Sequence, residues 1–472
     1  MRLGDLLAAA ADTGGADVDI TALAYDDREV APGTLFFCVP GFTRDGHDFA
    51  PRAVERGAAA LVVDRPLGLG VPEVVVDDVR RAMAPAAAAL QGDPTAAMDV
   101  VGITGTNGKT TTAYLVRTLL EAAGRHTGLL GTVQAIVGGQ ATDAVRTTPE
   151  AIDLQATFTA MREAGDTACV MEVSSHALAL GRADAIHWAV AVFTNLTQDH
   201  LDFHPTMEDY YAAKRRLFLA DPRATVINID DQYGRRLAAD LPGAITYGID
   251  AADAVLRAED VTFDLRGSSF RVGELACSLP LPGRFNVLNA LAAIGTARAL
   301  GIDDETIAQA LPGAAKAPGR FEPVDEGQDF AVLVDYAHTP DSLENVLTAA
   351  RPLTEGRVIS VFGCGGDRDR GKRPQMGEIS ARLADLTFVT SDNPRSEDPR
   401  AIIEEILGGV TDRDGVVAIE DRRAAIEAAI HAAEAGDVVV IAGKGHEQGQ
   451  EFAGGHKVPF DDATVAREAL RP

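Results

Sequence analysis

The residues best suited to chemistry form a glycine-rich run at 101–112, Val-Gly-Ile-Thr-Gly-Thr-Asn-Gly-Lys-Thr-Thr-Thr. An apolar segment, 100–103, leads into this run, and a helical pattern starts at Lys109. Backbone N–H groups and a helix N-terminus would therefore surround an anion, as in loops that bind nucleoside triphosphates. We expect ATP here, with Lys109 on the β- and γ-phosphates and the Thr110 hydroxyl on Mg²⁺. The expected phosphate loop consists of Gly105, Thr106, Asn107, Gly108, Lys109, Thr110 and Thr111.

The spacing of this loop departs from the usual Walker A pattern. The glycine expected five residues before Gly108 is replaced by Ile103, with Gly102 and Gly105 on either side. The motif indicates triphosphate binding and leaves the reaction open. A plain glycine-rich turn between a strand and a helix is the alternative.

Three further side chains follow apolar segments. Glu172 ends one such segment and suits a Mg²⁺ ligand, although a single glutamate at a strand end is more often a capping or solvated residue. His200 lies in a loop, 194–204, with two histidines and two aspartates, for which we favour function over ordinary loop polarity. Lys214 lies beside two arginines in a chain that uses arginine for most of its 43 basic residues. An amine that guanidinium cannot replace is indicated there, with chance survival of a lysine as the alternative.

The elements that must position these residues alternate between strands and helices. Apolar strands that are each followed by a polar cluster and a helix indicate a parallel sheet. Ligands bind beyond the carboxyl ends of such strands, where the candidate residues lie. The expected strands before the break at 311–314 are 100–103, 168–173, 190–193 and 226–229. Those after it are 332–334, 358–362, 387–389 and 438–441.

We therefore expect an α/β protein of three domains, near 1–96, 97–314 and 315–472. The length of 472 residues exceeds what one ordinary core supports. The first domain is a small α/β unit with apolar runs at 35–39, 58–63 and 74–76. The second is the parallel-sheet domain that contains the phosphate loop, and the third is a Rossmann-like α/β domain.

The composition argues against several classes of protein. A net charge of −27 repels phosphodiester backbones, so we expect no nucleic acid partner. The four cysteines are far apart and form no CxxC pair, which indicates a reducing compartment and no structural zinc. The apolar stretch 6–11 is too short for a signal peptide and predicts a first helix, and no run approaches the ~20 residues of a membrane span. We expect a soluble, cytoplasmic monomer without a membrane partner.

Motifs in all three expected domains resemble the Mur ligases, which build the peptide stem of the bacterial cell wall. The matching positions are 104–111, Glu172, 195–204, Lys214, 282–289, 335–341, 363–372, 392–395 and 442–447. The resemblance implies a ligase that adds the third residue to UDP-N-acetylmuramoyl-L-alanyl-D-glutamate. ATP phosphorylates the glutamate γ-carboxyl in such enzymes, and an amine attacks the acyl phosphate. We expect domain closure as well, because the amine and acyl phosphate sites belong to different domains.

The resemblance assigns roles residue by residue. Lys109, His200 and Lys214 would be catalytic, and Lys214 would carry a carbamate, which arginine cannot form. The implied Mg²⁺ ligands are Thr110, Glu172, His200 and the carbamate on Lys214. The implied nucleotide contacts outside the phosphate loop are Asn289, Asp335 and His338. The implied contacts of the UDP-muramoyl dipeptide, bound in part by the N-terminal domain, are Asp27, Thr147, Thr148, Ser174 and Arg182.

The motif 392–395 is linked to the amino acid that is added. Arg395 would pair with the distal carboxylate of meso-diaminopimelate through a bidentate guanidinium contact, whereas lysine-adding relatives lack this arginine. Glu447 could accept the distal ammonium. The implied diaminopimelate site consists of Arg368, Asp392, Asn393, Pro394, Arg395, Gly443 and Glu447.

Three positions depart from the family pattern. Asp27 stands where a serine contacts UDP, Leu180 replaces a glutamine, and Arg146 replaces an asparagine of some relatives. A carboxylate at position 27 can accept the uracil N–H but adds charge.

Four other functions stay open. The same ligation could use lysine or another diamino acid. A folylpolyglutamate synthase would share the phosphate loop but should lack the motif 392–395. A P-loop kinase or regulatory ATPase would make no amide, and a wall-assembly scaffold would have no catalysis.

Overall fold

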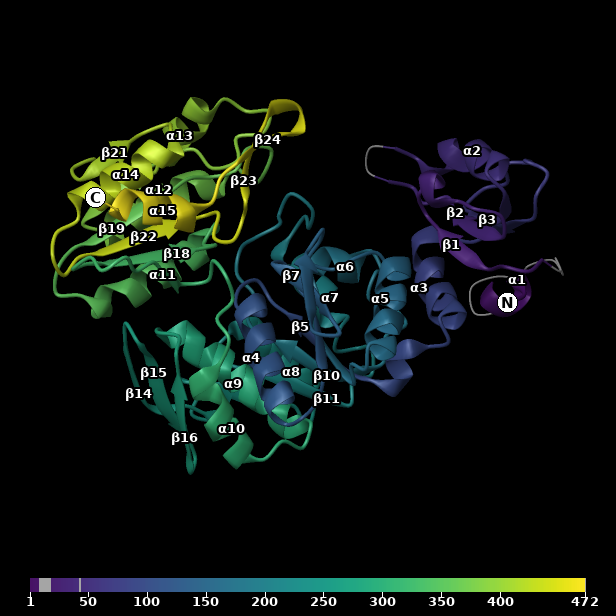
Figure 1. Ribbon diagram of the computed structural model, residues 1–472, viewed down its shortest axis with the longest axis horizontal. Helices are drawn as coiled ribbons and strands as arrows, with labels where there is room; N and C mark the ends of the chain where they lie inside the picture. The colour runs from purple at the N-terminus through teal and green to yellow at the C-terminus, as the bar shows by residue number, and fades with distance from the viewer. Residues whose placement is uncertain (8–17, 42–43, 472) are drawn as a thin grey trace. The chain divides into compact units, whose positions relative to one another are not determined.

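The computed structural model describes residues 1–7, 18–41 and 44–471, and its elements are labelled in Figure 1. The chain divides into two compact units. Residues 1–104, 120–192 and 212–225 form the first unit, and residues 105–119, 193–211 and 226–472 form the second. The predicted first helix begins as α1 (Leu3–Leu7), and its remaining positions, 8–11, lie outside the described residues.

The N-terminal part is a four-stranded parallel sheet with the order β1-β2-β3-β4. Alternate side chains of β2 and β3 enter two apolar cores: α1 and α3 pack on one core and α2 on the other. The predicted apolar runs at 35–39, 58–63 and 74–76 correspond to β2, β3 and β4. The bounds are β1 (Ala22–Ala24), β2 (Thr34–Phe37), β3 (Ala58–Val63), β4 (Glu73–Val75), α2 (Ala50–Glu55) and α3 (Val79–Leu90).

The central sheet has nine strands in the order β13-β12-β11-β10-β5-β9-β6-β7-β8. All four strands predicted here are present, as β5, β9, β10 and β11. The sequence analysis missed five shorter strands of this sheet, of which β8 is fully exposed and therefore has no apolar pattern. The bounds are β5 (Asp99–Thr104), β6 (Thr127–Leu130), β7 (Gln134–Val137), β8 (Gln140–Asp143), β9 (Ala168–Glu172), β10 (Trp188–Phe193), β11 (Ala224–Asn228), β12 (Ile245–Gly248) and β13 (Leu256–Arg257).

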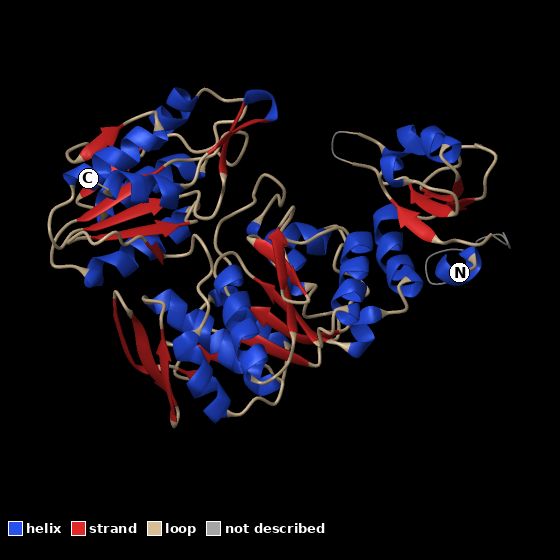
Figure 2. Ribbon diagram, in the orientation of Figure 1, coloured by secondary structure: helices blue, strands red, loops and turns tan. Residues whose placement is uncertain are grey.

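Helices connect these strands, as the blue ribbons in Figure 2 show. The helix predicted after the phosphate loop is α4, which starts at Lys109 as expected. An antiparallel sheet of three strands, β14-β15-β16, was not predicted. The bounds are α4 (Lys109–Ala122), α5 (Ala151–Glu163), α6 (Ser175–Ala179), α7 (Met207–Arg215), α8 (Gln232–Asp240), α9 (Arg284–Ala299), α10 (Asp304–Ala310), β14 (Glu259–Asp264), β15 (Gly267–Val272) and β16 (Leu275–Leu279).

The C-terminal part contains a six-stranded sheet with the order β17-β18-β22-β19-β20-β21. Strand β22 is buried along its whole length, and its side chains alternate between two cores. Helices α11, α12 and α13 pack on one core and α14 and α15 on the other, which is the layering of a Rossmann-like domain. A two-stranded hairpin, β23-β24, lies outside this sheet.

The four strands predicted for this part are β18, β19, β20 and β22. The strands are β17 (Glu322–Pro323), β18 (Ala331–Asp335), β19 (Val358–Phe362), β20 (Leu386–Val389), β21 (Val416–Ala418), β22 (Val438–Ala442), β23 (Gly449–Phe452) and β24 (His456–Pro459). The helices are α11 (Pro340–Ala350), α12 (Lys372–Leu383), α13 (Pro399–Leu407), α14 (Arg422–Ala432) and α15 (Asp462–Leu470).

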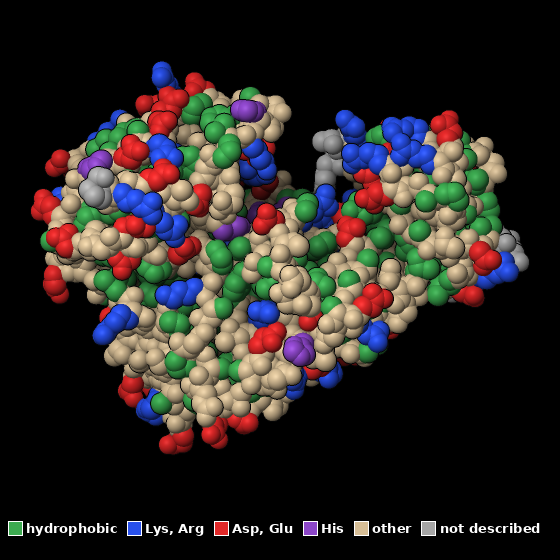
Figure 3. Space-filling view, in the orientation of Figure 1, with side chains coloured by type: hydrophobic (Ala, Val, Ile, Leu, Met, Phe, Trp, Pro, Cys, Tyr) green, Lys and Arg blue, Asp and Glu red, His purple; other side chains and the backbone are tan. Residues whose placement is uncertain are grey.

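The four cysteines, Cys38, Cys169, Cys277 and Cys364, are buried and free. In the described part of the chain, none of the helices combines the length and the apolar character needed to cross a membrane. On the face shown in Figure 3, acidic and basic side chains lie interspersed.

Candidate functional site

The phosphate loop connects the end of β5 to the start of α4. Gly108 has a φ of +84°, and a Cβ atom there would lie 2.4 Å from Asn289 Oδ1, so only glycine fits. The N–H of Asn107 donates to Asn195 Oδ1 at 2.9 Å, and the Thr194 hydroxyl donates to the Asn107 carbonyl at 2.7 Å. The loop is thus held by its backbone and by the segment that follows β10. Asn289 on α9 lies beside Gly108, and its nucleotide contact stays a prediction.

The Lys109 side chain folds back over the first residues of the phosphate loop. Its Nζ donates to the carbonyls of Gly105 at 3.0 Å and Thr106 at 2.8 Å. An ammonium group in this position can exchange these carbonyls for phosphate oxygens without a change of the helix that carries it. The geometry therefore suits the role predicted for Lys109.

Arg320 is a candidate residue that the sequence analysis missed. Its Nη2 donates to the Thr110 hydroxyl at 3.2 Å, and its guanidinium lies 4.5 Å from the centre of the Tyr336 ring. A cation here would oppose the charge of a phosphoryl group. The sequence did contain a signal, because Pro-Gly-Arg-Phe occurs at 282–285 and again at 318–321, and only the first copy was noted.

Asp335 ends β18 and His338 follows it, and the charge of Arg320 acts on both side chains. Burial raises the pKa of Asp335 to about 6, partly offset by Arg320 and by the Phe321 N–H, which donates to Asp335 Oδ2 at 2.7 Å. Burial also lowers the pKa of His338, and the charge of Lys372 acts in the same direction. A neutral imidazole at this position can both donate and accept a hydrogen bond.

The loop 194–204 contributes a second group of charges. Burial opposes the ionisation of Asp199, yet its pKa is lowered by His200 and His338. His200 has a φ of +55°, and its Nε2 lies 3.3 Å from Asp199 Oδ2. The strained backbone of His200 is a feature often found at functional positions.

Glu172 and Lys214, two predicted Mg²⁺ ligands, belong to the first unit, where each is 1% exposed. The Glu172 carboxylate accepts bonds from the N–H of Thr132 at 2.8 Å and from its hydroxyl at 3.0 Å. Among the described residues, no three His, Cys, Asp or Glu side chains form a metal-binding group. Carboxylate and hydroxyl oxygens nevertheless suit Mg²⁺, so the donors predicted at Glu172 and Thr110 fit this ion chemically.

Four of the five residues predicted to hold the UDP-muramoyl dipeptide, all except Asp27, lie close together in the first unit. The Thr148 hydroxyl donates to the Glu172 carbonyl at 2.8 Å and accepts from the Ser174 N–H at 3.1 Å. Arg182 Nη1 donates to the Thr148 carbonyl at 3.4 Å. The Thr147 hydroxyl lies 3.1 Å from that of Thr132.

Glu150 is a second residue that the sequence analysis missed. Its buried carboxylate binds Arg80 at 2.7 Å, Arg146 at 3.1 Å and Arg182 at 2.9 Å. Burial lowers the pKa of Arg182. Three guanidinium groups on one carboxylate leave excess positive charge, which suits an anionic ligand.

Asp27, one of the three positions that depart from the family pattern, makes its contacts with other residues than the remaining predicted UDP-substrate residues do. It is 6% exposed, and its carboxylate lies 2.9 Å from Arg52 and 3.8 Å from Arg56. The carboxylate is therefore neutralised within its own domain. The two arginines thus offset the negative charge that Asp27 adds in place of the family's serine.

The predicted amino-acid site lies at the carboxyl ends of β20 and β22. Lys444 is fully buried, and its Nζ contacts Asp392 at 3.3 Å, Asn393 at 2.8 Å and Glu447 at 3.1 Å. Burial disfavours the Asp392 carboxylate, but Lys444 and Arg422 lower its pKa. The buried amine thus holds three of the predicted residues together.

Arg395 completes this loop in a left-handed conformation with a φ of +50°. Its Nη1 donates to the Gly366 carbonyl at 2.7 Å, and its Nε donates to Glu451 at 3.1 Å. Gly443 lies against Asp392, since a Cβ atom there would come within 2.9 Å of its carboxylate, and the Pro394 carbonyl lies against Gly366. Arg368 is exposed and donates to the adjacent Asp367 carbonyl, and its Cγ lies on the same side of Gly365 as Arg395 Nη1.

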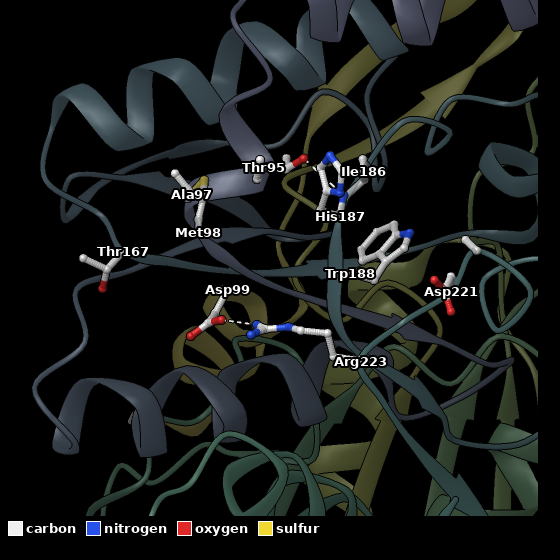
Figure 4. A pocket seen from close by; sticks show the side chains of 12 residues that line it. Thr95, Ala97, Met98, Asp99, Thr167, Ile186, His187, Trp188, Asp221 and Arg223 are labelled. Atoms are coloured by element: carbon white, nitrogen blue, oxygen red, sulfur yellow. Dashed lines mark hydrogen bonds and ion pairs between the residues drawn. The ribbon is translucent and has the colours of Figure 1, made fainter. Parts of the chain in front are cut away.

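A cavity of about 500 Å³ lies at the amino ends of strands of the central sheet (Figure 4). It is lined by residues that precede or begin β5, β9, β10 and β11, among them Asp99, Thr167, Trp188 and Arg223. Asp99 and Arg223 form an ion pair across it. None of the predicted site residues lines this cavity.

Three family models match successive parts of the chain. They describe a Mur ligase family catalytic domain at residues 19–92, a Mur ligase middle domain at 103–297 and a Mur ligase glutamate ligase domain at 319–445.

Similar proteins match over nearly the whole length. A UDP-N-acetylmuramoyl-L-alanyl-D-glutamate–2,6-diaminopimelate ligase of Geobacillus thermodenitrificans is 50% identical over 97% of this chain and 96% of its own. The ligase of the same name from Streptomyces coelicolor is 49% identical over 100% and 96%. A solved structure of such a ligase has a TM-score of 0.69 and 34% identity, and it covers 96% of this chain and 94% of its own.

Proposed function

Because the chain belongs to the Mur ligase family and has its three-domain α/β fold, we propose that it adds meso-diaminopimelate to UDP-N-acetylmuramoyl-L-alanyl-D-glutamate. The reaction would use ATP and form an amide on the D-glutamate γ-carboxyl, in the cytoplasm. The observation that carries the choice of amino acid is the Arg395 guanidinium, which Glu451 and the Gly366 carbonyl hold in place. This group can bind a distal carboxylate, which lysine lacks.

The side chains of the second unit support the phosphoryl step. Lys109 and the N-terminus of α4 would bind the transferred phosphoryl group, and Arg320 beside Thr110 would oppose its charge. Asn289, Asp335 and His338 would contact the nucleotide. Bound Mg²⁺ would neutralise phosphate charge, and Glu172, His200, Thr110 and a carbamate on Lys214 would hold it.

The residues of the first unit would bind the other substrate. Thr148, Ser174 and Arg182 already form one hydrogen-bonded group, and the adjacent Thr147 bonds to Thr132. The arginines around Glu150 would attract the anionic groups of the UDP-muramoyl dipeptide.

An assay of amide formation tests the proposed activity. The purified chain is given the UDP-muramoyl dipeptide, ATP and Mg²⁺, with meso-diaminopimelate or L-lysine as the amine. We expect a new amide and ADP with diaminopimelate and at least tenfold lower kcat/KM with lysine, the scale of one lost charged contact. Faster ligation of lysine would refute the role of Arg395, and release of ADP without an amide would refute ligation.

The carbamate proposal rests on the burial of Lys214 in a chain with few lysines. Lys214→Ala is expected to lose nearly all turnover and to regain part of it with short carboxylic acids. These acids would supply the missing negative charge. A variant that no such acid rescues, while it still folds, would argue against the carbamate.

A further inference from the structure

Residues 392–395 form a loop after β20, here called the amino-acid loop. Glu451 connects the β23-β24 hairpin to this loop at three points. The Arg395 N–H donates to the Glu451 carbonyl at 3.1 Å, and the Glu451 N–H donates to Asn393 Oδ1 at 2.9 Å. The third contact joins the two side chains, Arg395 Nε to Glu451 Oε2, at 3.1 Å. Neither the family resemblance nor the predicted site included Glu451.

The side-chain contact fixes how Arg395 presents its donors. A guanidinium has five N–H groups in one plane. Glu451 takes the Nε donor and the Gly366 carbonyl takes one Nη1 donor, whereas the described residues accept no bond from Nη2. Two bonds on different nitrogens fix the plane of the group and leave its Nη end for a ligand.

The residues around Arg395 leave room for this orientation of the guanidinium. A Cβ atom at Gly365 would lie 3.0 Å from Arg395 Nη1, so glycine lets the guanidinium approach the backbone closely. The side chains of Arg395 and Glu451 are 21% and 31% exposed, so a ligand can reach them. Backbone bonds from the hairpin stabilise the left-handed conformation of Arg395, which is otherwise strained for a non-glycine residue.

We propose, on the basis of the proposed diaminopimelate activity, that Glu451 is a positioning residue. Its carboxylate holds the Arg395 guanidinium so that the Nη groups meet the distal carboxylate of the amino acid. A competing view is that Glu451 imitates this carboxylate and hinders binding. The two views predict opposite effects when the Glu451 carboxylate is removed.

Magnitudes favour positioning over competition. Without Glu451, the Arg395 side chain would gain rotamer freedom that it must lose again when the amino acid binds. This entropy cost can weaken the binding constant by up to about 30-fold. Repulsion between two carboxylates about 6 Å apart in a water-accessible site corresponds to only about threefold. Loss of orientation should therefore exceed relief of repulsion.

The test compares Glu451→Ala and Glu451→Gln with wild type in steady-state ligation. We expect Glu451→Ala to raise the KM for diaminopimelate about tenfold, with less than a twofold change in kcat and in the KM for ATP. Glu451→Gln keeps an oxygen that can accept the Nε proton and should stay within about threefold of wild type. Both variants keep the backbone bonds to Asn393 and Arg395, so they isolate the carboxylate.

Glu378→Ala serves as the matched control, since Glu378 forms an exposed ion pair with Arg382 on α12 of the same domain. It should change no kinetic constant. If Glu451→Ala does not fold, Glu451→Asp is the second variant, because its shorter side chain retracts from Nε and should also raise the KM for diaminopimelate.

Three results would overturn the inference. A lower KM in Glu451→Ala would support competition, an unchanged KM would exclude positioning, and equal losses in Glu451→Ala and Glu451→Gln would show a purely structural role. A wild-type enzyme that prefers lysine would instead refute the proposed function, so the two failures are distinguishable.

Discussion

The phosphate loop and the amino-acid loop both follow buried parallel strands, but they are held in different ways. The phosphate loop depends on glycines and on the uncharged side chains of Thr194 and Asn195, and its one charged side chain, Lys109, contacts the carbonyls of the loop itself. The amino-acid loop depends on charged side chains from distant segments, chiefly Lys444 and Glu451. The first arrangement suits a phosphate group. The second can change its ligand by the exchange of a few side chains.

Lys109→Ala should give the largest effect, because it removes the cation of a loop whose shape is otherwise set by its backbone. We expect kcat to fall on the order of 10³-fold, as for loss of a charged group that stabilises phosphoryl transfer. The thermal unfolding midpoint should change little. A variant that keeps most of its activity would show that the backbone alone suffices.

Arg395→Lys tests the side-chain basis of the amino-acid loop. Lysine keeps the charge but loses the fork and the bond to Glu451, so the KM for diaminopimelate should rise roughly 10- to 100-fold. The KM for ATP should stay within about twofold, since the phosphate loop shares no contact with Arg395. Equal increases in both constants, measured by initial rates, would contradict the assignment.

Asp335→Asn should give the smallest effect, on the pH dependence of stability. The pKa of Asp335 is raised to about 6, so the folded state holds the proton more tightly than the unfolded state. Wild type therefore loses stability as the pH rises from about 4 to about 6, by about 1 kcal/mol after allowance for partial solvent access. Asparagine does not titrate, so the variant does not lose this stability. The thermal unfolding midpoint of the variant minus that of wild type should therefore be larger at pH 7 than at pH 4.5. An identical difference at both pH values would contradict the shift.

The contrast between the two loops also explains what could be predicted from the sequence. The buried strands and the phosphate loop were predicted because their signals are local: apolar runs, glycines and a helix start. The strands β8 and β14 were missed because their exposed residues give no apolar signal. In β15 and β16 only alternate residues are buried, so neither strand forms the continuous apolar run by which the other strands were predicted. Glu150 and Glu451 were missed because their roles arise from contacts between segments that are far apart in the chain. Arg320 was missed although the second Pro-Gly-Arg-Phe copy contains it.

The resemblance to Mur ligases correctly indicated the family and the α/β fold. It also implied Arg368 in the amino-acid site, and in the structure this exposed side chain lies beside Gly365, as Arg395 does. The predicted domain boundaries and the roles of individual residues stay predictions. Experiments on single residues are therefore the next step.

The burial of all four cysteines makes the native chain suited to site-specific labelling. Burial raises the pKa of Cys38, Cys277 and Cys364 to about 12, and it raises the pKa of Cys169 as well. Few thiolates are present at neutral pH, so maleimide dyes should react slowly with the folded protein. Cysteines introduced at exposed positions of the two units could then carry a donor and an acceptor dye. Energy transfer between them would report the expected domain closure as substrates are added.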